Sequence, residues 1–437
     1  MILFLLFIVL IAYLFIVFKR AKRYKYNTSN DYLYNLDKAI ISNLKLDNNK
    51  LELPNNYKEF DSLFLKINLS FNLLSYFLKP YIKIENKKYF FEYGAKGVRY
   101  LNLSHIANNR VKITTKNITL SRIDAALYGY KNSIDLSKKI LILAPHADDA
   151  EIAAFGLYKM AKDVTIVTTT IGEHGLCNYC DIYNSDRLIN SLKKAELRTV
   201  DALTTPLLGN VEMKNSLTLG YFGGSLKWMS ENQGKKASSY VDGFNNMNAF
   251  RKVSHANVKL PLEVEPTYEA FLNDLKEIIT QIKPDIIITP HPTIDSHQDH
   301  KHTTIGLIKA MESLNFSSKL LLYTNHLELS ETYPVGNINS SISLPPNRRE
   351  FYFDSIYSFE CNTEMQTDKF FALESIHDLR DSLVFFSIKR ALKHLNRLVK
   401  RKITGKDNSY FRRAIRANEL FFVVESKNIF KFLKSQH

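Results

Sequence analysis

Residues 139–151 have the sequence KILILAPHADDAE, and this stretch decides the fold class. The run 139–144 is short and almost wholly apolar, which is typical of a strand buried in a parallel sheet. Pro145 ends the run, and apolar residues at helical spacing follow from Asp149 onward. His146, Asp148 and Asp149 therefore stand at the carboxyl end of a predicted strand, where open α/β sheets form their binding sites.

The same pattern occurs again about 150 residues later in the chain. Residues 284–290, with the sequence PDIIITP, predict a second buried strand, and a polar loop follows from 291 to 296. A helix is predicted from His297 to about Glu312, so that His297 and His300 share one helical face. Because two strand ends of one sheet can bring their loops together, we expect the two motifs to meet.

The residue types of the two motifs suit a divalent metal ion. Zinc binds neutral imidazole and carboxylate groups, and a catalytic zinc site keeps one position open for water. His146, Asp149 and His300 would provide three ligands, and bound water then ionises near neutral pH. Since adjacent side chains diverge, Asp148 is predicted to act as the base that takes the proton of the water.

Two further side chains of the second motif are candidates for the transition state. His297 is placed to stabilise the oxyanion of a tetrahedral intermediate. Asp299 is placed to keep that imidazole oriented or charged. The motifs together predict a hydrolase whose cofactor is Zn²⁺ or another divalent metal.

These residues resemble the LmbE/PIG-L family of zinc-dependent N-deacetylases. The first motif of that family is His-Pro-Asp-Asp-Glu or His-Ala-Asp-Asp-x-Glu, and residues 146–151 match the second form. Its second motif, His-x-Asp-His, is matched at residues 297–300. The resemblance implies the same roles as the chemistry: metal ligands His146, Asp149 and His300, general base Asp148, and His297 with Asp299 at the oxyanion.

The resemblance covers about residues 138–385 and implies contacts to a substrate. Arg187 stands where the family often has a substrate-contacting arginine. His174 follows the predicted strand 164–169, and His291 lies in the loop before the second motif; an ordinary loop residue is the alternative interpretation for both. Residues 369–380 resemble the closing helix of the family. The implied reaction removes the acetyl group from an N-acetylated amino sugar and leaves a free amine and acetate.

The sequence predicts an α/β fold with a Rossmann-like, mostly parallel sheet flanked by helices in residues 138–385. A small β-containing domain is predicted at 62–130, where runs such as 81–84 and 110–114 are separated by turn residues. Residues 19–61 are predicted to be a basic flank followed by a partly helical linker. The aromatic segment 209–261 is long enough to form a lid or a substrate wall.

The beginning of the chain predicts a membrane anchor. Residues 2–18 contain no charge, and as a helix they would be about 25 Å long. No basic segment precedes them and no small-residue cleavage site follows, which argues against a cleaved signal peptide. Five basic residues in 19–25 place the N-terminus outside and the enzyme in the cytoplasm. The alternative is an uncleaved export signal on a periplasmic or lumenal enzyme.

The net charge of +15 is concentrated at two places. Residues 19–25 contribute five positive charges and residues 389–416 contribute a net ten, so the remainder of the chain is balanced and no nucleic-acid partner is indicated. Within the segment 386–437, apolar residues at 388, 392, 395 and 399 recur at helical spacing among basic ones. This favours a helix on an anionic membrane surface. A solvated basic helix, or one that holds the phosphates of a substrate, is the alternative.

The three cysteines do not indicate a disulfide framework. Cys177 and Cys180 are interpreted as loop thiols, because a structural zinc would need two further ligands. No protein partner is evident. The anchor favours a lipid-linked or surface-glycan precursor as substrate, and two other classes stay open: a non-catalytic glycan- or membrane-binding protein on the same fold, and a metal phosphoesterase.

Overall fold

The computed structural model describes residues 2–21, 24–47, 49–70, 72–121, 125–175, 186–379, 388–405 and 409–434. The chain forms two compact units, each built from three separate segments. Unit 1 comprises residues 1–132, 327–350 and 383–418, and unit 2 comprises residues 133–326, 351–382 and 419–437. Both sequence motifs lie in unit 2.

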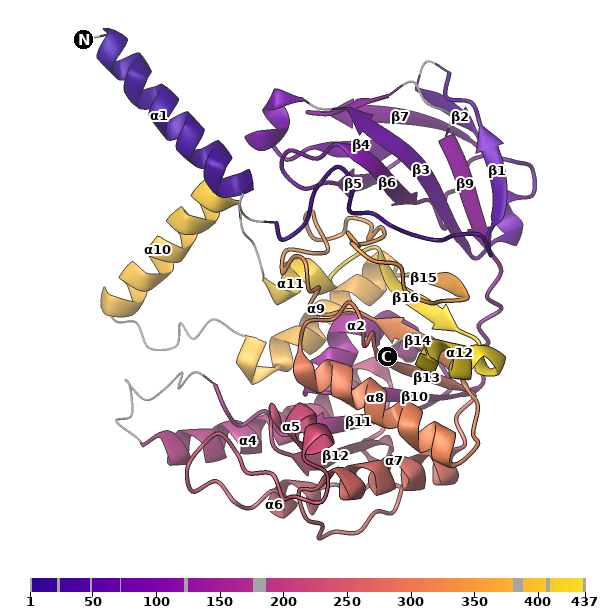
Figure 1. Cartoon of the computed structure of the whole chain (residues 1–437), viewed down its shortest axis with the longest axis vertical. Coiled ribbons are helices and arrows are strands. Elements are labelled where there is room, and N and C mark those ends of the chain that lie inside the picture. Colours follow the sequence, from indigo (N-terminus) through magenta and orange to yellow (C-terminus); the bar gives the residue numbers. More distant parts are fainter. Residues whose placement is uncertain are drawn as a thin grey trace. The chain divides into compact units, whose positions relative to one another are not determined.

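A seven-stranded sheet forms the centre of unit 2 (Figure 1), in the order β12-β11-β10-β13-β14-β16-β15. Its strands are β10 (Lys139–Ala144), β11 (Asp163–Thr170), β12 (Ser216–Tyr221), β13 (Ile286–Pro290), β14 (Lys319–Tyr323), β15 (Ser355–Glu360) and β16 (Asn418–Val424). The pairs from β12 to β14 are parallel, whereas β16 runs antiparallel to β14. Strands β10, β11 and β12 follow one another toward one edge of the sheet. The chain then returns to the middle and places β13 on the other side of β10. The order therefore reverses between β10 and β13, the two strands that precede the motifs.

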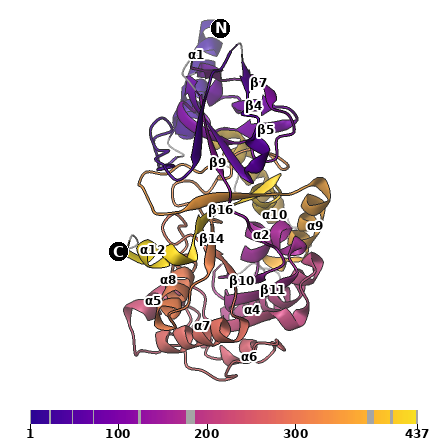
Figure 2. The same ribbon diagram turned by 90° about the vertical axis from the view of Figure 1, so that its right-hand side faces the viewer.

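Helices cover both faces of this sheet (Figure 2). α2 (Asp149–Met160) and α9 (Thr363–Ser375) pack on one face, where Ile142, Phe155 and Ala372 share one buried core. α7 (Tyr268–Ile282) and α8 (Gln298–Ser313) pack together on the other face. The other helices among the described residues of unit 2 are α4 (Arg187–Thr204), α5 (Ser225–Glu231), α6 (Asn248–Arg251) and α12 (Ile429–Lys434).

Unit 1 contains two antiparallel sheets. One has the order β1-β9-β3-β6 with β8 paired to β3, and the other has the order β2-β7-β4-β5. The strands are β1 (Ile40–Leu44), β2 (Lys50–Glu52), β3 (Ser62–Ser70), β4 (Tyr81–Ile84), β5 (Lys87–Phe90), β6 (Gly97–Asn102), β7 (Arg110–Lys116), β8 (Thr119–Leu120) and β9 (Ala125–Tyr130). Leu65, Ile82 and Ile113 belong to one buried core that both sheets share. Helices α1 (Ile2–Ala21), α10 (Ile388–Thr404) and α11 (Tyr410–Ala414) complete the unit.

The chain is thus a mixed α/β protein. The expected parallel arrangement describes strands β12 to β14 of unit 2, whereas the pairings within unit 1 are antiparallel. The expected helical part of residues 19–61 is wrong: this stretch forms β1, β2 and one 3₁₀ turn at Tyr57–Glu59. Local propensity misses these strands because their partners, β9 and β7, lie about 60 to 90 residues further along.

Two other segments differ from what the sequence indicates. The segment 209–261 contains regular structure that the sequence does not indicate, namely edge strand β12 and helices α5 and α6, and its role as a lid or substrate wall stays a prediction. The closing helix expected at 369–380 is α9, which begins earlier and ends at Ser375 because Ile376 adopts an extended backbone.

The compact units also differ from the boundaries that the sequence suggests. The sequence places one domain at 138–385, whereas unit 2 includes residues 419–437 and leaves out 327–350. The basic segment 386–437 is divided as well. Arg412 and Arg416 are buried in unit 1 and donate to backbone carbonyls of residues 332–341, so they add nothing to a basic surface.

Helix α1 is apolar and exposed along its length. Among the described residues, Leu3–Arg20 is the stretch whose length and composition would allow it to cross a membrane. Only 6% of this stretch is buried within the protein, although Tyr13 and Arg20 contact other residues in the second half of the helix.

Candidate metal centre

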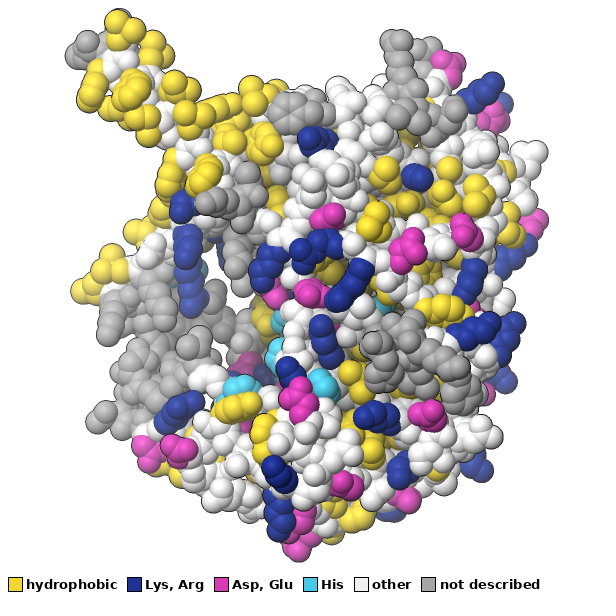
Figure 3. All heavy atoms as spheres, in the orientation of Figure 1, with side chains coloured by type: hydrophobic (Ala, Val, Ile, Leu, Met, Phe, Trp, Pro, Cys, Tyr) yellow, Lys and Arg dark blue, Asp and Glu magenta, His cyan; other side chains and the backbone are white. Residues whose placement is uncertain are grey.

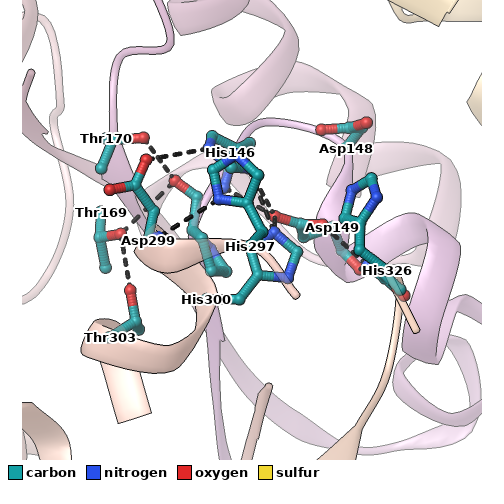
Figure 4. A network of polar contacts seen from close by, with 12 residues as sticks. His146, Asp148, Asp149, Thr169, Thr170, His297, Asp299, His300, Thr303 and His326 are labelled. Carbon is teal, nitrogen blue, oxygen red and sulfur yellow. Dashed lines mark hydrogen bonds and ion pairs between the residues drawn. The ribbon is translucent and has the colours of Figure 1, made fainter. Parts of the chain in front are cut away.

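The motif residues converge at the point where the strand order reverses. His146 follows β10, Asp149 is the first residue of α2, and His300 lies in the first turn of α8, directly after β13 and its loop. Open α/β sheets bind their ligands in the crevice beside such a reversal. The expectation that the two motifs meet is therefore confirmed by their positions (Figure 4).

Three donor atoms form a small triangle at this point. Asp149 Oδ2 lies 3.1 Å from His146 Nδ1 and 3.0 Å from His300 Nε2, and the two imidazole nitrogens are 3.3 Å apart. Tetrahedral zinc with bonds of about 2.0–2.1 Å holds its ligand atoms roughly 3.3 Å from one another. The three atoms are therefore within a few tenths of an ångström of the separation that a bound metal requires.

Both imidazoles are oriented by carboxylates on their far side. His300 Nδ1 lies 3.1 Å from Asp295 Oδ2, and His146 Nε2 lies 3.3 Å from Asp299 Oδ2. If each far nitrogen donates its proton to the carboxylate, the nitrogen that faces the triangle keeps its lone pair. Carboxylate–histidine pairs of this kind fix the tautomer of metal ligands.

The carboxylate ligand is held as firmly as the imidazoles. Asp149 Oδ1 accepts a hydrogen bond of 2.8 Å from Asn325 Nδ2, and Asp149 Oδ2 accepts one of 2.9 Å from the backbone N–H of His146. Asp295 Oδ2 also accepts from the backbone N–H groups of Asn325 and His326. The loop after β14 thus supports both acidic residues.

The electrostatics of the centre favour a cation. Burial alone would lower the pKa of His300, but the carboxylates of Asp149 and Asp295 outweigh it and raise the pKa well above its usual value. Two groups of potential ligands share His300: one adds His146 and His297, and the other adds Asp149 and His326. The donor types and their spacing fit a divalent metal.

Asp148 lies apart from the triangle, as Figure 4 shows, although it is adjacent to Asp149 in sequence. Its side chain is 12% exposed, and its carboxylate lies 3.5 Å from an Nη of Arg198. Arg198 also forms a short ion pair with Asp378. The sequence instead indicated Arg187 as the arginine of the site, but Arg187 is the exposed first residue of α4 and Arg198 comes three turns later.

His297 is the residue just before α8, and its Nδ1 accepts a hydrogen bond of 3.2 Å from the backbone N–H of Asp299. This bond leaves the proton of a neutral imidazole on Nε2. Burial lowers the pKa of His297 to about 3, and the imidazoles of His146 and His300 act in the same direction. The expectation that Asp299 keeps His297 charged is therefore not supported, since the Asp299 carboxylate contacts His146.

The other expected substrate contacts have different surroundings. His174 is half-buried, and its ring lies 5.5 Å from that of Tyr240. His291 is fully buried and its ring contacts those of Phe351 and Phe422, so it packs in the core. Cys177 and Cys180 lie outside the described residues.

Sequence reasoning missed Arg198, Asn325 and His326. Asn325 and His326 follow the apolar run 319–323 that forms β14, so the strand-end rule used for the two motifs would also indicate them. Arg198 lies within a helix and has no local signal.

Comparison with known protein families gives a match over part of the chain. Residues 141–311 match the family described as GlcNAc-PI de-N-acetylase, PIG-L. No curated protein matches the sequence.

Several solved structures are similar to the chain. An N,N'-diacetylchitobiose deacetylase from Pyrococcus horikoshii is 18% identical with a TM-score of 0.35, over 67% of this chain and 85% of that chain. A zinc-inhibited form of a teicoplanin deacetylase is 15% identical with a TM-score of 0.34, over 66% and 99%. A 4-carboxy-2-hydroxymuconate hydratase from Pseudomonas putida is 12% identical with a TM-score of 0.34, over 66% and 96%. The chemistry of this chain must therefore be argued from its own residues.

Proposed function

We propose that this chain, whose residues 141–311 form a PIG-L domain, is a metal-dependent hydrolase that removes the acetyl group from an N-acetylated amino sugar. The observation that supports this most directly is the triangle of Asp149 Oδ2, His146 Nδ1 and His300 Nε2, with sides of 3.0–3.3 Å. The proposed cofactor is Zn²⁺, and another divalent metal would suit the same donors. We place the triangle on a Rossmann-like parallel sheet, at its reversal of strand order.

The other residues of the site would divide the reaction among them. A divalent metal, when bound, supplies a water of lowered pKa and polarises the carbonyl of the amide. Asp148 would take the proton of the attacking water and pass it to the leaving amine. His297 would donate its Nε2 proton to the developing oxyanion as a neutral imidazole, because the backbone N–H of Asp299 occupies Nδ1.

Arg198 would act on Asp148 and not on the metal. Its guanidinium is held by Asp378 on one side and reaches Asp148 Oδ1 at 3.5 Å on the other. This contact would fix the position of the Asp148 carboxylate, which a general base needs in order to meet its proton donor. His174 stays a candidate for substrate contact.

The position of the enzyme would select the substrate. If α1 spans a membrane, the basic residues 19–25 favour a cytoplasmic catalytic unit, with the N-terminus outside. The favoured substrate is then a lipid-linked or surface-glycan precursor of the N-acetylglucosamine type, presented at the cytoplasmic leaflet.

Acetate release tests this function. The purified full chain, loaded with Zn²⁺, should release acetate from at least one member of a panel of N-acetylamino sugars with lipid, nucleotide or no aglycone. Treatment with a chelator should stop the release, and added Zn²⁺ should restore it. Hydrolysis of the nucleotide-linked members to a nucleoside monophosphate and a sugar phosphate, without acetate, would support the metal phosphoesterase instead. Neither product, with zinc bound at less than one ion per chain, would support a non-catalytic protein.

Asp299→Asn should weaken metal binding about 10- to 100-fold, because the amide no longer fixes the tautomer of His146 as a carboxylate does. Competition with a chromophoric chelator measures the zinc affinity. Asp378→Asn is the matched control, since Asp378 pairs with Arg198 and should leave zinc affinity unchanged. If Asp299→Asn leaves the zinc affinity unchanged but slows acetate release, Asp299 acts on His297 and not on His146.

A further inference from the structure

Three elements of unit 1 expose apolar side chains and meet near one residue, Arg20. Helix α1 is apolar on the face that Figure 3 shows, and the basic residues Lys19 and Arg20 stand in its last turn. The 3₁₀ turn η2 (Leu73–Tyr76) and the residues after it expose further leucines, as does one face of α10. The exposed residues outside α1 are Leu73, Leu74, Leu78, Ile388, Leu392, Leu395, Leu398 and Val399.

Arg20 ties these elements together. Its side chain donates to the backbone oxygens of Lys402 and Ile403, at 3.1 and 3.3 Å, in the last turn of α10. Another nitrogen donates to the oxygens of Tyr76 and Phe77, at 2.5 and 2.8 Å. The last carbonyls of a helix have no partner within it, and a cation there also suits the helix dipole. Arg20 is only 8% exposed, so its side chain is enclosed by the elements that meet at this junction.

A contact between two aromatic rings shows where η2 lies along the axis of α1. Tyr13 stacks on Phe77 with ring centroids 4.3 Å apart. Tyr13 precedes Arg20 by seven residues, which is about 10 Å along the helix axis. Residues 73–78 therefore lie beside the last two turns of α1. α10 begins far from α1 and meets it only at the Arg20 end, so the two helices diverge from this junction (Figure 1).

We propose that η2 and α10 form a membrane-docking surface that inserts into the leaflet through which α1 leaves the bilayer. The inference rests on the proposed membrane placement of α1. The occupant is the interface of an anionic lipid leaflet. Leu392, Leu395 and Val399 recur at helical spacing on one face of α10, while Arg397, Lys400 and Arg401 occupy the rest.

The basic residues of α10 complement anionic lipid headgroups, which favours a lipid surface over a protein partner. An apolar stripe beside basic residues is the pattern of helices that lie in the headgroup region, with their apolar side about 5–10 Å deep. The leucines of η2 would lie at a similar depth in the leaflet, because Phe77, directly after this turn, stacks on Tyr13 of α1. The surface would hold unit 1 at three elements and so fix its orientation at the membrane, which a single helix cannot do.

Single-tryptophan variants of the full chain test this surface. Trp228 is the sole tryptophan, so Trp228→Phe supplies a silent background. On this background we would introduce Leu74→Trp in η2 and Leu395→Trp in α10. The controls are Arg397→Trp, on the opposite side of α10, and Ile40→Trp, on the exposed strand β1. Leu10→Trp reports the anchor itself. Each protein is reconstituted into vesicles of phosphatidylcholine and phosphatidylglycerol whose acyl chains are brominated near the headgroup.

Brominated lipid should quench about half of the emission of Leu74→Trp and Leu395→Trp, and little of the two controls, because bromine quenches only at the depth of the acyl chains. Replacing phosphatidylglycerol by phosphatidylcholine should reduce the quenching of Leu395→Trp. Quenching of Leu10→Trp with no more quenching at 74 and 395 than in the controls would overturn the docking surface alone. No quenching of Leu10→Trp would overturn the anchor and the docking surface together. Acetate release, measured separately, decides the proposed function.

Discussion

Asp148→Asn should slow acetate release about a thousandfold, the middle of the range for a lost general base, while the protein keeps its zinc. The two neighbouring aspartates have different surroundings, which is why one substitution can separate base from ligand. Asp149 completes the donor triangle, whereas Asp148 lies apart from it beside Arg198. The amide of asparagine cannot accept the proton of water, but it fits the space of the carboxylate. Zinc content after dialysis and the rate of acetate release are the two measurements.

Asp149→Asn is the matched control because it makes the same chemical change one residue later. It replaces the anionic ligand that lies 3.0–3.1 Å from both imidazoles, so zinc should be lost together with activity. Loss of zinc in Asp148→Asn would show that the roles of the two aspartates are wrongly divided. A nearly normal rate in Asp148→Asn would assign the base to another residue.

Lys369→Met should destabilise unit 2 by about 3 kcal/mol, because it leaves a buried carboxylate without its counter-ion. Lys369 Nζ and Glu419 Oε1 are 2.8 Å apart, and both side chains are 2% exposed. Glu419 also accepts from the backbone N–H groups of Gly156 and Leu157, at 2.8 and 2.9 Å, just after Ala154 departs from helical geometry in α2. The pair therefore supports the helix that begins with Asp149.

The stability of this pair can be measured with a native reporter. Trp228 is the sole tryptophan and lies in unit 2, so urea denaturation followed by its emission reports on this unit. Lys193→Met removes an exposed pair with Glu196 and should cost less than about 1 kcal/mol. The double variant Lys369→Met/Glu419→Gln should recover part of the loss, since it removes the unpaired charge. Equal effects of Lys369→Met and Lys193→Met would contradict the role of burial.

The sequence allowed the core of the site to be predicted because each motif has a local signal. His146 and Asp149 follow one buried strand, and His300 follows another. The strand before each motif therefore indicates that its side chains lie at the edge of the sheet. The partner of Asp299 could not be predicted in the same way. Its sequence neighbour is His297, but its carboxylate reaches His146, which is about 150 residues away.

Long-range contacts account for the other differences. Arg198 reaches Asp148 through the packing of α4, and no feature near residue 198 indicates this. Strands β1 and β2 depend on partners that follow them by 60 residues or more. The junction at Arg20 joins residues 383 positions apart, so the sequence shows the two helices but not their contact.

Strand β16 determines the order in which the protein can mature during synthesis. It lies between β14 and β15 in the sheet, although among the described strands it follows both of them in sequence. β15 therefore has no neighbour within the sheet until residues 418–424 have emerged, and Glu419 arrives with them. Domains usually fold as units while the chain is being made. Unit 2 would instead be completed only after residues 418–424 have been made, long after helix α1 has left the ribosome.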